Sequence, residues 1–382
     1  MDKYLSRKIE VLSFLSIILV LFLHSSIGGK FDFWKITESA GIVNDIIMLS
    51  FPQGITRIAV PLFMLISGYL FFRNVERGGQ IIHKYKSRFY SLVIPYLFWE
   101  LLWLVIVMGV VFLGIKLGVT NESFKSTFFA DNLKFDKDLI WTFLRPLPVW
   151  QFWFLRDLIC LIIISPIIYY LTKTLKFVAV LIVIMIMCFV FAEGDSSDIC
   201  YKFFEGCYLN RSSASIVFFM LGSYFAICNQ KIVFNRCRGL YYPLIFALVW
   251  FVTLAFRAYF SYQSNGYIWS CVLFQISVLA GILCVWTGYD IISRKCDLDW
   301  LNDYLPYSFF IYCFHIPVMT YMSVAFRFVL LSKVFGVFPR SGLAYALDYF
   351  FTPVLVFVMA IVLARITKNK MPGLYRLSTG GR

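Results

Sequence analysis

The chain has 382 residues, of which 60% are hydrophobic and 15% are charged, and its mean hydropathy is +0.79. This composition excludes a pair of soluble domains, because no polar block is long enough to form one and apolar blocks that could cross a hydrocarbon core of roughly 30 Å recur along the chain. The net charge of +14 does not indicate nucleic-acid binding. Basic residues in short loops beside membrane spans are first of all a topology signal.

We therefore expect an all-α, polytopic integral membrane protein, with about ten transmembrane helices in a single domain that covers residues 1–382. The first apolar run is kept as a span, because no small-residue cleavage site follows it. The predicted spans are residues 10–28, 48–72, 89–116, 152–172, 177–193, 213–229, 240–260, 267–291, 305–330 and 346–366, and a short tail follows at 367–382.

Basic residues decide the predicted orientation. The N-terminus, the even-numbered loops and the tail hold most of the 35 Lys and Arg residues, whereas the odd-numbered loops hold most of the acids. Only Arg57 and Arg156 are assigned to spans. Both termini are therefore expected in the cytoplasm. The two long loops, 117–151 and 194–212, are then outside, either as solvated connectors or as a lid or acceptor platform. A disulfide between Cys200 and Cys207 is conceivable in the second loop.

The second predicted span contains the most informative stretch, which begins at Arg57 and ends at Tyr69. An arginine inside hydrocarbon is costly, so Arg57 should face a protein interior or a watery cavity. Pro61 cannot donate to the carbonyl of Arg57, and we expect a bend there. Ser67 and Gly68 leave a bare patch that another helix or a ligand can approach. The stretch is interpreted as one wall of a functional cavity, with a structural salt bridge as the alternative.

Ionisable residues of several spans fall at similar depths. Counted from the inner ends of the spans at 1.5 Å per residue, His24, Arg57 and the Arg156-Asp157 pair lie at about 21–24 Å, and Glu100 and His315 at about 15–17 Å. Burying unrelated charges at one level without partners would be very expensive, which favours a shared hydrated pocket.

His24 is the candidate for acid–base chemistry, because imidazole exchanges a proton near neutral pH and arginine does not. A histidine bonded to a backbone carbonyl is an equal alternative for His24, and a bond between helices explains His315 as well. Trp153 fits an aromatic belt at the outer interface. Arg88, followed by Tyr96, begins the third span on the inner side, where basic residues either bind an anionic cofactor or retain a cytoplasmic loop.

Several motifs occur in the order found in the bacterial membrane acyltransferase-3 family, and the chain resembles that family from about residue 8 to 365. The resemblance depends on a first-span histidine (His24), the Arg57-x-x-x-Pro61-x-Phe63-x-x-x-Ser67-Gly68-Tyr69 signature, Arg88 with Pro95-Tyr96-Leu97-Phe98-Trp99, Trp153-Phe154-Leu155-Arg156-Asp157-Leu158, and Ser308-Phe309-Phe310-Ile311-Tyr312 to His315. Many members have an arginine eleven residues before the first-span histidine, but here that position is Ser13.

The resemblance implies an O-acyltransferase of the bacterial cytoplasmic membrane that moves an acyl group, usually acetyl, from acyl-CoA to a hydroxyl of a surface polysaccharide, a lipid-linked glycan or a similar envelope molecule. No cofactor is bound; acetyl-CoA is a co-substrate, and no metal site and no nucleic-acid partner are expected. By carry-over, His24 and Arg57 are the catalytic residues. The expected substrate-binding residues are Arg156, Ser67, Arg88, Trp153, Tyr96 and His315.

In the predicted mechanism, His24 removes the proton from the acceptor hydroxyl, which attacks the thioester. Arg57, together with Arg156, stabilises the developing oxyanion or holds the acceptor. An acyl-histidine relay is a variant of this mechanism. The alternative functions are a transporter or flippase for an envelope lipid or glycan, in which the same polar layer binds a passing headgroup, and a sensor or scaffold without catalysis.

Overall fold

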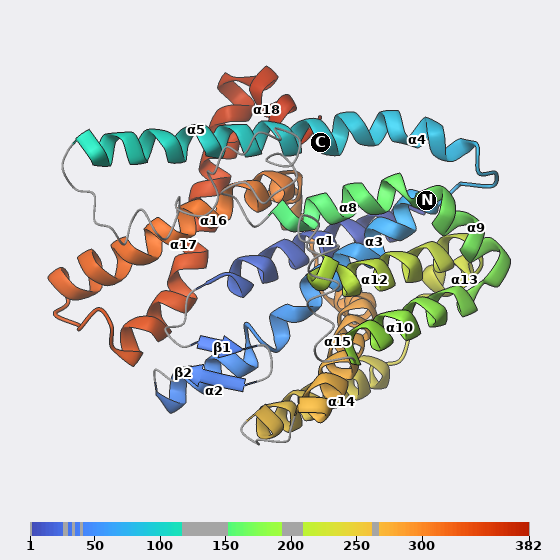
Figure 1. The fold of residues 1–382 in the computed structure, drawn as a ribbon, viewed down its shortest axis with the longest axis horizontal. Helices are drawn as coiled ribbons and strands as arrows, with labels where there is room; N and C mark the ends of the chain where they lie inside the picture. Colours follow the sequence, from blue (N-terminus) through green and yellow to red (C-terminus); the bar gives the residue numbers. More distant parts are fainter. Residues whose placement is uncertain are drawn as a thin grey trace. The chain divides into compact units, whose positions relative to one another are not determined.

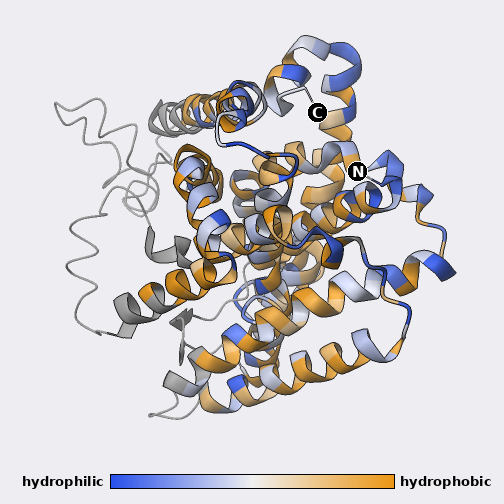
Figure 2. Ribbon diagram, turned by 90° about the vertical axis from the view of Figure 1, so that its right-hand side faces the viewer, coloured by the Kyte–Doolittle hydropathy of each residue, from blue (hydrophilic) through white to orange (hydrophobic). Residues whose placement is uncertain are grey.

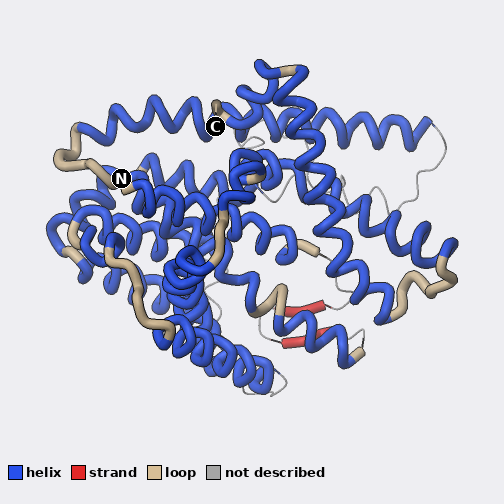
Figure 3. Tube along the Cα trace, turned by 180° about the vertical axis from the view of Figure 1, so that it is seen from behind, coloured by secondary structure: helices blue, strands red, loops and turns tan. Residues whose placement is uncertain are grey.

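A computed structural model of the chain describes residues 2–25, 30–32, 35–38, 41–116, 152–192, 209–261 and 267–381. Helices make up almost all of this part, and a two-stranded antiparallel hairpin is its sheet (Figure 3). The predicted outer loop 117–151, residues 194–208 of the second outer loop, and the cysteine pair Cys200–Cys207 lie outside the described residues. Two compact units divide the chain, and each takes segments from separate parts of the sequence.

The first unit comprises Met1–Ile66 and Gln230–Ile366. Its elements are α1 (Lys3–Leu23), β1 (Lys30–Asp32), β2 (Lys35–Glu38), α2 (Ile42–Ser50), the 3-10 helix η1 (Ile55–Ile58), the start of α3 (Ala59–Phe72), α13 (Gln230–Phe234), α14 (Tyr241–Ser261), α15 (Tyr267–Lys295), η4 (Asp299–Asp303), η5 (Leu305–Tyr307), α16 (Ser308–Ala325), the π-helix η6 (Phe326–Val334) and most of α17 (Gly342–Lys370). Within this unit α14 and α15 pack against each other, and α1 contacts η1, α15 and α16 (Figure 1).

The second unit comprises Ser67–Asn229 and Thr367–Arg382. Its elements are the end of α3, α4 (Gln80–Arg88), the π-helix η2 (Phe89–Val93), α5 (Ile94–Lys116), α8 (Trp153–Ile163), α9 (Ser165–Leu175), α10 (Phe177–Ala192), α12 (Leu209–Ile227), the end of α17 and α18 (Pro372–Thr379). The π-helix lies where Pro95 removes the N–H that the carbonyl of Ser91 would accept in a regular helix.

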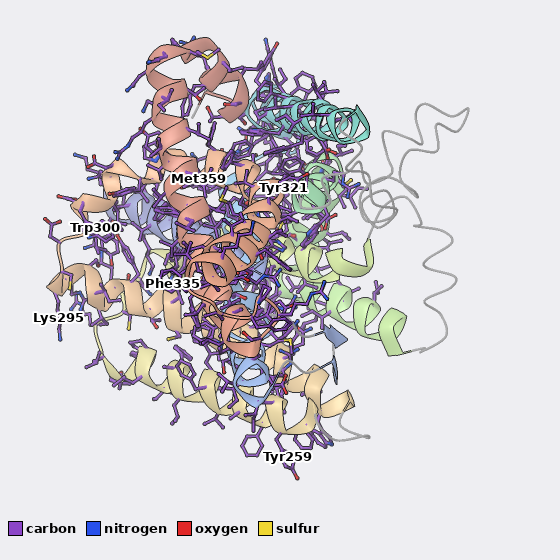
Figure 4. All side chains as sticks on the ribbon, turned by 90° about the vertical axis from the view of Figure 1, so that its left-hand side faces the viewer. Tyr259, Lys295, Trp300, Tyr321, Phe335 and Met359 are labelled. Carbon is purple, nitrogen blue, oxygen red and sulfur yellow. The ribbon has the colours of Figure 1, made fainter. Side chains whose placement is uncertain are left out.

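Hydrophobic residues recur along the helices (Figure 2), and many of the large ones are exposed. Leu248 on α14 is 65% exposed, and Tyr259, Trp300 and Phe335, labelled in Figure 4, are also exposed. A helix that is hydrophobic all round is typical of a membrane span. Within the described residues, six helices are long and apolar enough to cross a membrane, and seven if α8 and α9 form one bent span. The chain is thus a multi-pass membrane protein.

The predicted count of ten spans and the predicted cytoplasmic position of the termini stay predictions. Three of the expected spans are not among these helices. α1 carries Arg7, Lys8 and Glu10 near its start, and among the described residues α10 comprises 16 residues and the apolar stretch of α12 comprises Ser215–Ile227.

One predicted span is broken. Residues 152–172 were expected as a continuous helix, but α8 and α9 meet at a bend of 64°. Pro166 stands in the first turn of α9, and proline cannot continue the hydrogen-bond ladder of a preceding helix. The hydroxyl of Tyr85 donates to the carbonyl of Ile163 at 2.9 Å, which satisfies an acceptor that the break releases.

Candidate active site

His24 lies directly after α1, where its backbone N–H donates to the carbonyl of Val20 at 3.2 Å and closes the helix. Its side chain is half-buried. The next residue, Ser25, is buried, and its hydroxyl donates to the carbonyl of Tyr349 on α17 at 3.0 Å. The end of α1 is therefore fixed to α17 by a buried hydrogen bond, which holds the imidazole of His24 at a defined place in the first unit.

The side chain of His315 on α16 faces His24. The two ring centroids are 5.4 Å apart, with 30° between the ring planes. His315 is 0% exposed, and its Nδ1 lies 2.5 Å from the carbonyl oxygen of Tyr312. A carbonyl can only accept, so Nδ1 carries a proton, and in the neutral ring Nε2 then carries the lone pair. Among the described residues, no hydrogen-bond partner reaches this Nε2. His315 is thus a buried acceptor beside a half-buried imidazole.

Arg57 lies in η1, after a break in the helix, and the position of this break corrects the sequence prediction. We expected a bend at Pro61, but the chain leaves the helix earlier, in the turn Phe51–Gly54 between α2 and η1. Pro61 instead stands in the first turn of α3, where its missing N–H has no helical partner to lose. The Nη2 of Arg57 donates to Oε1 of Gln53 at 2.5 Å.

A second arginine approaches the same turn, and the sequence analysis missed it. Arg257 on α14 is 2% exposed, its guanidinium lies 4.6 Å from the ring centroid of Phe274, and its Nη1 donates to the backbone carbonyl of Gln53. Arg257 was not among the arginines predicted to lie within spans, which were Arg57 and Arg156. A cation inside the apolar run of α14 was a visible signal, because intramembrane charge marks functional sites.

The other predicted polar residues lie in the second unit. Glu100 on α5 is 4% exposed. Its carboxyl group accepts a hydrogen bond from the hydroxyl of Tyr96, one turn earlier, and interacts electrostatically with Arg156 on α8. Asp157, next to Arg156, is also buried. Of the residues expected in one polar layer, His24, Arg57 and His315 belong to the first unit, and Glu100, Arg156 and Asp157 belong to the second. Their meeting in one pocket stays a prediction.

Ser67 and Gly68 lie on the part of α3 that belongs to the second unit, and helix packing explains the glycine. A Cβ at Gly68 would overlap the carbonyl oxygen of Phe219, so the backbones of α3 and α12 come too close for any larger residue. The side chain of Ser67 is half-buried. The bare patch is thus occupied by another helix at Gly68.

Arg88 ends α4, and Trp153 begins α8, and both side chains are half-buried. The ring of Trp153 packs edge-on against Phe154, with centroids 6.3 Å apart, and the ring of Tyr96 packs edge-on against Phe152, with centroids 6.1 Å apart. Within the part of the chain that is described, no group of three or more His, Cys, Asp or Glu side chains is placed to bind a metal ion.

Two ion pairs of the first unit were also missed by the sequence-based prediction. Lys8 on α1 pairs with Asp290 on α15 at 2.7 Å, and Arg327 pairs with Asp348 on α17 at 3.2 Å. Tyr4 also donates to Asp290 at 2.6 Å; its own burial and the carboxylate raise the pKa of Tyr4 to about 12, so this hydroxyl keeps its proton. Partners so distant in sequence cannot be paired from spacing alone.

Known proteins share sequence similarity with nearly the whole chain. A family model described as "Acyltransferase domain" matches residues 7–367. The chain is 22% identical to the succinoglycan biosynthesis protein ExoH of Rhizobium meliloti (strain 1021), over 100% of this chain and 94% of the relative. No solved structure matches the chain. The family match covers nearly the whole sequence and decides for catalysis over transport: the chain belongs to the acyltransferase-3 family and is an acyltransferase that transfers groups other than aminoacyl groups.

Proposed function

We propose that the protein is an O-acyltransferase of the bacterial cytoplasmic membrane, which moves an acetyl group from acetyl-CoA to a hydroxyl of a surface polysaccharide or of a lipid-linked glycan. The polysaccharide acceptor is suggested by the name of the relative, a succinoglycan biosynthesis protein. The acyl-CoA donor and the hydroxyl acceptor follow from the family resemblance of the motifs around His24 and Arg57.

The observation that carries this proposal is the pair of imidazoles, His24 and His315, at the end of α1. A general base must exchange a proton near the operating pH, and histidine does so. His24 is half-buried and thus partly exposed, whereas His315 is fully buried. His24 is therefore the base, and the lone pair on Nε2 of His315 is an acceptor for a proton held on His24 or on the substrate hydroxyl.

In the proposed reaction, a nitrogen of His24 takes the proton from the acceptor hydroxyl while the hydroxyl oxygen attacks the thioester carbonyl. The tetrahedral intermediate carries a negative oxygen, which the guanidinium of Arg57 stabilises. When the C–S bond breaks, the thiolate of CoA leaves and takes up the proton from the imidazolium of His24. The products are the acyl ester and free CoA, and the base returns to its neutral form.

The test measures CoA release by the purified protein from acetyl-CoA, with and without the glycan, and the mass of the glycan product. We expect His24→Ala to lower the rate by about two to four orders of magnitude, because positioned general-base catalysis has this value. The variant should elute as the same monodisperse species as the wild type. Undiminished turnover by His24→Ala would remove the histidine from the mechanism, and no CoA release by the wild type would remove acyl-CoA as the donor.

A further inference from the structure

Two arginines from distant parts of the first unit converge on one residue. The Nη2 of Arg57 donates to the side-chain oxygen of Gln53, and the Nη1 of Arg257 donates to the backbone oxygen of the same residue. Gln53 therefore links the guanidinium on α14 to the guanidinium in η1. The sequence separation between Gln53 and Arg257 is 204 residues, so only the fold brings the two together.

The turn that carries Gln53 is closely held from other sides. The hydroxyl of Thr56 donates to the carbonyls of Phe51 at 2.9 Å and of Pro52 at 3.3 Å. A Cβ at Gly54 would overlap the carbonyl oxygens of Ser50 and Leu49, so the chain folds back tightly on the end of α2. In a turn packed this tightly, a shift of the backbone carbonyl of Gln53 also moves the side chain of Gln53.

Arg257 is placed to fix this turn and does not reach outward. It is 2% exposed, and its guanidinium carbon lies 4.6 Å from the ring centroid of Phe274. A buried guanidinium that lies beside an aromatic ring and whose Nη1 is bonded has little freedom to move. Arg57, in contrast, is half-buried.

We propose that Arg257 is a positioning residue for Arg57: it holds the backbone of the Gln53 turn, and Gln53 in turn directs the guanidinium of Arg57 toward the reacting group. The inference depends on the proposed acyl transfer, in which Arg57 acts on the oxyanion. Arg257 does not touch the substrate in this scheme. Its contribution reaches the reaction through one hydrogen-bonded residue.

The first part of the test replaces Arg257 and follows the steady-state kinetics of acyl transfer per monodisperse protein molecule. Because a small misplacement of a catalytic group costs about ten- to hundredfold in rate, we expect Arg257→Gln to lower kcat by about tenfold. KM for acetyl-CoA should stay the same, since an interaction made only in the transition state changes kcat. Arg257→Lys keeps a hydrogen-bond donor but lacks the planar guanidinium. Its kcat should lie between those of the wild type and Arg257→Gln.

The second part breaks the link at Gln53. Gln53→Ala removes the oxygen that accepts from Arg57 and leaves the backbone carbonyl that accepts from Arg257. We expect Gln53→Ala to lower kcat to a similar extent, and Arg257→Gln to add less than about a twofold loss in the Gln53→Ala background, because residues of one network are not additive. Losses that multiply independently would overturn the proposal.

Thr253→Val provides the matched control. Thr253 is buried one turn before Arg257 on α14, and its hydroxyl donates to the carbonyls of Val249 and Trp250 within its own helix. This variant should keep wild-type kcat. A loss in Arg257→Gln that appears only as less folded protein, at unchanged kcat per folded molecule, would also overturn the proposal. His24→Ala is assayed in parallel: an inactive wild type removes the proposed function and this inference together, whereas an active wild type with an inert Arg257→Gln removes the inference alone.

Discussion

The two ends of α1 carry buried polar groups with opposite properties. Near its start, Lys8 pairs with Asp290, whose second oxygen accepts from the backbone N–H of Cys237 at 2.9 Å, and the ammonium lies 4.2 Å from the ring centroid of Trp286. After its end, His24 faces His315, whose Nε2 has no hydrogen-bond partner among the described residues. A site with its hydrogen bonds satisfied stabilises the fold, whereas a site that keeps an acceptor open is suited to a substrate.

The largest effect on stability should come from removing one partner of the Lys8–Asp290 ion pair. Lys8→Ala leaves the carboxylate of Asp290 buried without its cation, and removing one partner of a buried pair costs about 3–5 kcal/mol. We expect the free energy of unfolding, measured by denaturation in detergent, to fall by this amount. The activity of the protein that remains folded should not change.

A paired replacement provides the control for this prediction. Lys8→Met combined with Asp290→Leu removes both charges together, and such exchanges are often neutral in stability. The double variant should therefore be more stable than Lys8→Ala. If Lys8→Ala and the double variant both lose as much activity per folded molecule as His24→Ala does, the Lys8–Asp290 pair is not merely structural. The contrast between the two ends of α1 would then be wrong.

Changes at the His24–His315 pair should lower activity more than stability. His315→Ala removes the acceptor at Nε2, and a hydrogen bond to a charged group contributes about 1.5–3 kcal/mol. We therefore expect kcat to fall by about ten- to hundredfold. The control is Cys313→Ala on the same helix, which is also buried and tests for a loss of packing alone. Equal kcat values in the two variants would show that His315 acts only as a core residue.

Ser25→Ala should have the smallest effect of this set. The variant loses the hydrogen bond from Ser25 to the carbonyl of Tyr349, and one such bond contributes about 0.5–1.5 kcal/mol to stability. Because this bond fixes the chain next to His24, we expect a loss of kcat of a few fold as well. Stability is measured by thermal unfolding and kcat by CoA release; a decrease in stability with kcat unchanged would mean that the position of His24 does not depend on this bond.

Patterns along the chain predicted the membrane-protein class, the family and the candidates His24, Arg57 and His315, because long apolar runs and charges inside them are local signals. They did not predict the pairing of His24 with His315, since two histidines nearly 300 residues apart meet only through the packing of α1 on α16. Pro166 is a local signal for the bend between α8 and α9, because proline interrupts the hydrogen bonds of a preceding helix. The predicted span 152–172 did not take it into account.

Arg257 illustrates a different reason for failure. The sequence shows an arginine in an apolar run, but it does not show what this arginine binds. Its bond to the carbonyl of Gln53 depends on a turn whose shape comes from Thr56 and Gly54. The position of the break before Arg57 has the same cause. Proline was the strongest local signal in that stretch, yet it is tolerated in the first turn of a helix, and the α-helix is interrupted earlier, between α2 and η1.

The last helix, α18, affects how the protein can be handled. The indole N–H of Trp99 donates to the carbonyl of Ser378 at 2.8 Å, and Gly380 adopts a positive φ of 68° with no room for a Cβ against the backbone of Ser91. Because these contacts hold the segment onto the start of α5, an affinity tag or fluorescent reporter should be joined through a flexible linker after Gly381, and replacing Gly380 with a linker residue that has a side chain should loosen the second unit at its π-helix.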